Sequence, residues 1–151
     1  MKKVLFLDVD GVLNNGKWAA QMYEQGVRVY KEDLLYEPSL EQLRRIMKST
    51  GALIVISSAW RQITTCYRHL QEWLQRYGLE IYDKTPYVGG ERGNDITLWF
   101  ERNPGKWQYA ILDDEYDMGK HIDHLVYTDF DTGLTEQEAN QCIKLLNQDD
   151  E

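Results

Sequence analysis

Short apolar runs recur along the chain, and most of them end abruptly in polar or charged residues. The runs at 4–7, 52–56 and 109–112 contain no polar alternation. A continuous apolar run of this length is typical of a strand that is buried on both faces, as in a parallel sheet. Less continuously apolar stretches at 80–82 and 124–129 predict further strands of the same sheet.

Amphipathic stretches lie between these runs. Residues 38–51, 63–78, 92–103 and 135–146 repeat apolar side chains at intervals of three or four, which is typical of helices with one buried face. Alternation of strand and helix predicts an α/β fold, a doubly wound (Rossmann-like) parallel sheet with helices on both faces.

The length of 151 residues predicts a single domain over 1–151, with a minimal cap at most. Two segments are candidate flap or cap insertions, at about 14–37 and 78–93. In the first, Trp18, Met22 and Tyr23 have helix-like spacing, and residues 27–30 alternate like a short strand. These side chains are candidates either for a lid or for ordinary packing.

Carboxylates follow the first strand immediately. Asp8 and Asp10 are two residues apart, so on an extended backbone they point to the same side, and Gly11 then lets the chain turn away. Acidic side chains beside a core need a partner, and the carboxyl end of a parallel strand is where α/β sheets place ligands. A hard cation is the expected partner.

The second strand ends in hydroxyls, Ser57 and Ser58, with Arg61 close behind. We expect a helix to follow directly and to aim its free N–H groups at the same place. Taken alone, the serines are also compatible with helix caps, and Arg61 with a surface ion pair.

The run at 109–112 repeats this design, because Asp113, Asp114 and Asp117 follow it. Several acids at one sheet edge repel one another strongly in a low-dielectric environment, and a divalent cation removes the conflict. All-oxygen ligands favour Mg²⁺ over a transition metal.

A basic residue lies at the start of the helix predicted at 92–103, where the helix dipole disfavours it. Arg92 must therefore be positioned by something else, and a phosphoryl group would serve. Lys84 and Lys106 are rival cations, and a surface pairing of Arg92 with Glu91 or Asp95 is the structural alternative.

The string Asp8-Val9-Asp10-Gly11-Val12-Leu13 resembles the first motif of the haloacid dehalogenase (HAD) superfamily of hydrolases. Ser57 after its strand resembles the second motif, Arg92 the third, and Asp113-Asp114 or Asp113 with Asp117 the fourth. More narrowly, the segments D-V-D-G-V-L-N, I-S-S-A-W-R, E-R-G-N-D-I, I-L-D-D and G-L-T are similar to small HAD domains associated with RNA repair proteins.

This resemblance implies a phosphatase that works through an aspartyl-phosphate. Asp8 would be the nucleophile and Asp10 the general acid and base. Mg²⁺ would be held by Asp8, the Asp10 carbonyl and Asp113, supported by Asp114 or Asp117. Ser57 and Arg92 would bind the phosphoryl oxygens, and we keep Ser58 and Arg61 as further phosphate-binding candidates.

Charge limits the partners that we expect. A net charge of −8 disfavours a protein that coats nucleic acid electrostatically, although a local basic funnel is compatible with it. No apolar run reaches the length of a membrane span, and the apolar start is short for a signal peptide, so we expect a cytoplasmic protein without a membrane partner. The oligomeric state stays open.

Short insertions predict an open site that suits a large phosphorylated substrate, such as a polynucleotide end or a phosphoprotein, or a site closed by a partner subunit. Trp18, Trp60 and Tyr87 are candidates for stacking on bases. The alternatives are a small-molecule or nucleotide phosphatase, and a non-catalytic Mg²⁺-binding module similar to a response-regulator receiver.

Overall fold

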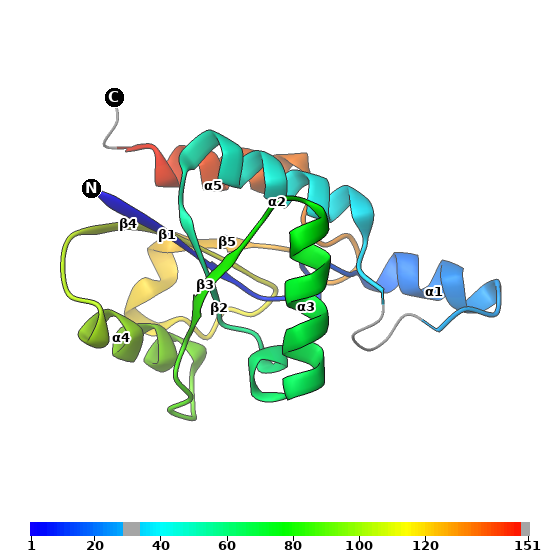
Figure 1. Ribbon diagram of the computed structural model, residues 1–151, viewed down its shortest axis with the longest axis horizontal. Coiled ribbons are helices and arrows are strands. Elements are labelled where there is room, and N and C mark those ends of the chain that lie inside the picture. The colour runs from blue at the N-terminus through cyan, green and yellow to red at the C-terminus, as the bar shows by residue number, and fades with distance from the viewer. Residues whose placement is uncertain (29–33, 149–151) are drawn as a thin grey trace.

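The computed structural model describes residues 1–28 and 34–148, and its centre is a parallel sheet (Figure 1). The sheet has five strands in the order β3-β2-β1-β4-β5. Their bounds are β1 Lys2–Leu7, β2 Leu53–Ile56, β3 Ile81–Lys84, β4 Trp107–Asp113 and β5 Leu125–Tyr127. Every paired strand is parallel, which confirms the predicted sheet and places β2, β1 and β4 side by side.

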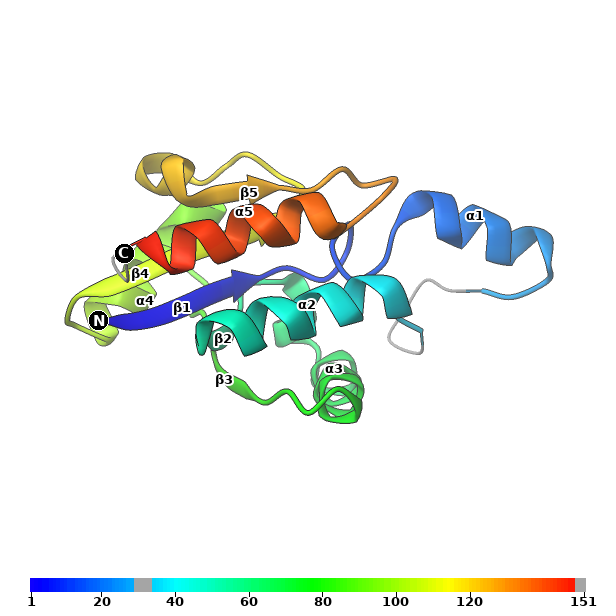
Figure 2. The ribbon, with the colours of Figure 1, turned by 90° about the horizontal axis from the view of Figure 1, so that it is seen from above.

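Helices cover both faces of this sheet (Figures 1 and 2). The α-helices are α1 Gly16–Glu24, α2 Glu37–Thr50, α3 Thr64–Arg76, α4 Arg92–Arg102 and α5 Glu136–Leu146, with 3₁₀ turns η1 Ala59–Gln62 and η2 Gly119–His124. Side chains of α2, α3 and α5 pack on the face that contains Leu5 and Leu7. α4 packs on the face that contains Val4 and Phe6. The strict period of two along β1 thus divides one apolar run between two cores.

The first candidate insertion contains α1, which projects beyond the carboxyl end of the sheet (Figure 2). Asn15 begins this helix, because its side-chain oxygen accepts a hydrogen bond from the Trp18 amide at 2.7 Å. The predicted strand at 27–30 falls partly in residues 29–33, outside the described residues, and residues 27–28 have no strand structure.

The second candidate insertion, 78–93, is mostly part of the fold itself. Residues 81–84 form β3, which pairs with β2, and α4 begins at Arg92. Only the loop at 85–91 is left to act as a flap over the site.

Among the described helices, none is long and apolar enough to cross a membrane.

Candidate active site

Three polar side chains form one row across the carboxyl edge of the sheet. Asp8 directly follows β1, and its amide donates to the Leu112 carbonyl of β4 at 3.0 Å. Ser57 directly follows β2, and its amide donates to the Leu7 carbonyl at 3.0 Å. The register therefore aligns Ser57, Asp8 and Asp113 on adjacent strands, where paired residues project to the same side.

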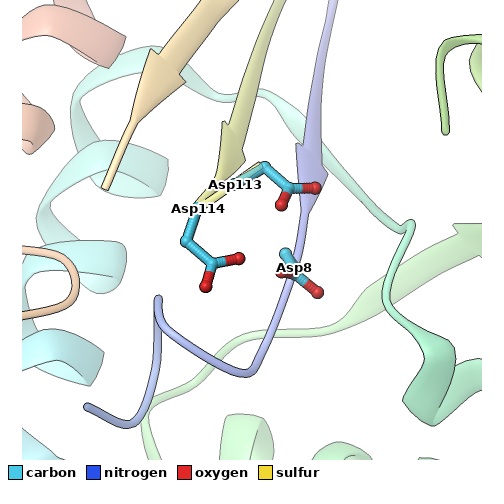
Figure 3. A group of neighbouring side chains, drawn as sticks. All are labelled: Asp8, Asp113 and Asp114. Atoms are coloured by element: carbon cyan, nitrogen blue, oxygen red, sulfur yellow. The ribbon is translucent and has the colours of Figure 1, made fainter. Parts of the chain in front are cut away.

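Asp8, Asp113 and Asp114 bring carboxylate oxygens within 4.8 Å of one another (Figure 3). Gly11 makes this approach possible. Its φ of 79° is in the left-handed region, and a Cβ there would overlap the Asp114 carboxylate. Asp117, the sequence alternative to Asp114, does something else: its Oδ2 accepts from the Arg92 amide at 3.1 Å and so caps the start of α4.

Crowding and burial raise the pKa values of Asp113 and Asp114. Burial first, and then the charge of Asp8, raises the pKa of Asp113 to about 8, although Arg92 opposes the shift. Burial and Asp8 likewise raise the pKa of Asp114 to about 6. Anionic oxygens held this closely are a fitting ligand set for a hard divalent cation, which relieves their repulsion.

Arg92 is the cation that the structure places in the cluster. Its Nη1 lies 2.6 Å from Asp113 Oδ2 and 3.1 Å from Asp8 Oδ1. Burial alone would lower the pKa of Arg92, but the two carboxylates outweigh burial and raise it. The rivals lie elsewhere: the Lys84 ammonium sits over the Tyr67 ring, and Lys106 immediately precedes β4, at the opposite end of that strand.

Asp10 is exposed, and two side chains for which the sequence predicts no such role hold it in position. The indole N–H of Trp60 lies 3.2 Å from each oxygen of Asp10. The Asn14 amide donates to Asp10 Oδ1 at 2.9 Å and accepts from the Gly11 amide at 2.9 Å. The Asp10 carboxylate is not part of the cluster of three. The metal-binding role that the resemblance implies for the Asp10 backbone carbonyl stays a prediction.

Trp60 corrects one expectation. Only 5% of its surface is exposed, so it is too buried to stack on a base. A tryptophan four residues after an apolar strand resembles a packing residue in sequence, and nothing in its spacing predicts that its N–H reaches back to the first strand's loop. Of the other stacking candidates, Trp18 packs against Tyr36, and Tyr87 is exposed in the loop after β3.

Ser57 and Ser58 differ sharply in their environments. Ser58 accepts a hydrogen bond from the Trp60 amide at 3.1 Å and begins η1. Ser57 Oγ is buried and has no hydrogen-bond partner among the described residues. The helix predicted at 63–78 is present as α3, Thr64–Arg76, but η1 separates it from the serines, so it does not follow them directly.

The phosphate-binding role expected of Arg61 disagrees with its contacts. Its guanidinium is buried and ion-paired with Asp95 at 2.9 Å. Its remaining N–H groups donate to backbone carbonyls, with distances of 2.8 Å to Thr85, 2.9 Å to Ser57, 2.8 Å to Ser58 and 3.5 Å to Pro86. Since these acceptors use every donor of the guanidinium, Arg61 holds the loops together and has none left for a ligand.

A family model described as the HAD domain in Swiss Army Knife RNA repair proteins matches residues 4–139. No curated protein and no solved structure matches the chain. The matched range contains every carboxylate, hydroxyl and guanidinium of the site described above.

Proposed function

Because the chain belongs to the family of HAD domains in Swiss Army Knife RNA repair proteins, we propose that it is a Mg²⁺-dependent phosphomonoesterase. In this proposal Asp8 is the nucleophile, and the reaction runs through an aspartyl-phosphate. Polynucleotide ends are the proposed substrate.

The observation that carries the proposal is the buried Ser57 hydroxyl. A buried polar atom without a partner costs free energy, and native proteins rarely keep one without a use. Ser57 is next to Asp8 in the sheet register, and Arg92 contacts the same Asp8 carboxylate. A phosphoryl group at Asp8 would give the hydroxyl an acceptor and Arg92 a further anion.

Each step of the reaction has a side chain suited to it. Asp8 attacks phosphorus, the bond to the ester oxygen breaks, and Asp10 donates the proton that this leaving oxygen needs. Asp10 then removes a proton from water, which attacks phosphorus and releases phosphate from Asp8. Trp60 and Asn14 hold Asp10 in place for both transfers.

The metal would be held by Asp8, Asp113 and Asp114 together with the Asp10 carbonyl. When bound, Mg²⁺ would neutralise the charge of the nucleophile and of the phosphate, which otherwise repel each other. Arg92 contributes to the same neutralisation from the α4 side.

The substrate proposal rests on the family description and on the small size of the covering elements. With α1 at one side and only the 85–91 loop at another, a site of this kind suits the end of a long molecule. The alternatives are a small phosphomonoester and a non-catalytic Mg²⁺-binding module. The positioned Asp10 carboxyl disfavours the non-catalytic module, because a domain that only binds Mg²⁺ does not need a general acid held in place.

Phosphate release tests the proposal. We would compare p-nitrophenyl phosphate with oligonucleotides phosphorylated at the 3′ or the 5′ end, with and without Mg²⁺, in wild type and Asp8→Asn. Release that requires Mg²⁺ and Asp8 and favours one oligonucleotide end is the expected result. Mg²⁺ binding without release from any substrate would contradict it and favour the binding module.

A further inference from the structure

Two tyrosines beside the candidate active site are stacked on each other and open to solvent. The rings of Tyr116 and Tyr127 lie with centroids 4.4 Å apart and planes 12° from parallel. Tyr116 is 63% exposed and Tyr127 is 38% exposed. Large aromatic rings at such exposure contribute little to folding, so a flat exposed pair is a candidate for contact with another molecule.

The sheet register connects this pair directly to the reacting centre. Tyr127 of β5 is the register partner of Asp113 of β4. The backbones of neighbouring strands are about 4.8 Å apart along the hydrogen-bonding direction. The row formed by Ser57, Asp8 and Asp113 therefore continues into Tyr127. Tyr116 follows Asp113 by three residues, in the segment after β4, and its ring stacks on Tyr127.

We infer that the Tyr116–Tyr127 pair is a stacking platform for the terminal nucleobase of a phosphorylated polynucleotide end. The inference rests on the proposed function and adds a substrate-binding site to it. A nucleobase has a flat π-face that extends a stack of parallel rings, and stacking of this kind tolerates any base.

The charges around the platform agree with an occupant that is a neutral ring. Asp114 and Glu115 precede Tyr116, and Asp129 follows Tyr127. These carboxylates repel a phosphate backbone, so a single neutral base fits here better than a run of nucleotides. The terminal phosphate itself would lie at Asp8 of the same row, in contact with Ser57 and with Arg92 of α4.

The test compares an intact phosphorylated end with the same oligonucleotide ending in an abasic ribose. We expect Tyr116→Leu and Tyr127→Leu to raise KM for the intact end roughly 5- to 100-fold, with little change in kcat and little change for the abasic end. Tyr116→Phe keeps the ring and should behave as wild type. Tyr82→Leu is the matched control, because Tyr82 is exposed at the opposite edge of the sheet, on β3.

Calorimetric binding of both oligonucleotides to Asp10→Asn protein separates the two proposals. Equal effects of the tyrosine variants on intact and abasic ends, no effect at all, or failure of the intact end to bind would overturn the platform. Ring-dependent binding without phosphate release in wild type would leave the platform standing and contradict the phosphatase.

Discussion

Arg92 Nη1 lies 2.6 Å from Asp113 Oδ2, and Asp113 is fully buried. This pair joins the start of α4, a helix that covers one face of the sheet, to the end of β4, a strand of the sheet. The same nitrogen is also ion-paired with Asp8. One guanidinium therefore offsets the negative charge of two neighbouring carboxylates, which would otherwise repel each other.

Replacement of Arg92 should therefore affect both stability and turnover. We expect Arg92→Met to lose about 2–4 kcal/mol of the metal-free protein's unfolding free energy, because it leaves buried charge unpaired. Its kcat/KM should fall by about 100-fold or more. Arg92→Lys should recover part of both. Denaturant unfolding and initial rates check this, and an unchanged rate in Arg92→Met would exclude a role at the phosphate.

The raised pKa values predict a pH-dependent response to Mg²⁺. In the metal-free protein, the folded-state pKa values of about 8 for Asp113 and about 6 for Asp114 exceed the unfolded value of about 4. Their contribution to stability is present below about pH 4 and is lost as pH rises through those values.

Protons and Mg²⁺ compete for the same oxygens, so a fixed Mg²⁺ concentration should raise Tm more at about pH 8 than at about pH 6. Thermal scans with and without Mg²⁺ at both pH values measure the difference. Asp113→Asn should abolish the Mg²⁺ response, whereas an equal Tm rise at both pH values in wild type would contradict the assigned ligands.

Gly11 offers a test of the cluster that leaves all its ligands in place. Gly11→Ala combines a strained φ with an overlap between the new Cβ and Asp114. We expect it to cost about 1–3 kcal/mol and to reduce the Mg²⁺-induced rise in Tm. Gly78→Ala is the control, since Gly78 has a similar φ of 72° and open space around it, so it should keep the full Mg²⁺ response.

Trp60 should act on catalysis through Asp10. Trp60→Phe keeps a buried ring but removes the N–H that holds the Asp10 carboxylate. We expect kcat to fall about 10-fold with KM nearly unchanged. Trp107→Phe also loses an indole hydrogen bond, to Asn103, but lies at the amino end of β4 and should leave kcat alone. Equal losses in both variants would mean a general effect on the fold.

Much of the architecture is readable from the sequence because it depends on local periodicity. Unbroken apolar runs predict the strands. The carboxylates that follow these strands predict a cluster of Asp8, Asp113 and Asp114, which the fold brings together. Arg92 was predicted at a helix start, and α4 begins there. The phosphate-binding and catalytic roles of these residues stay predictions.

The remaining features depend on contacts between distant segments, which no local pattern encodes. The pairing of Arg61 with Asp95 joins η1 to α4, and the hydrogen bond from Trp60 to Asp10 joins residues that are fifty positions apart. The Tyr116–Tyr127 stack arises only because β5 is placed beside β4. In each case the sequence shows the residue type but does not show which distant residue it contacts.

The most direct test of the central claim is to trap the phosphoryl group on the protein. A good leaving group needs little proton donation, so Asp10→Asn with p-nitrophenyl phosphate and Mg²⁺ should form the aspartyl-phosphate faster than it loses it. Rapid acid quenching and peptide mass spectrometry should then find the phosphoryl group on Asp8. Turnover by the wild type with no phosphorylated peptide in the variant, or with the group on another residue, would contradict the account.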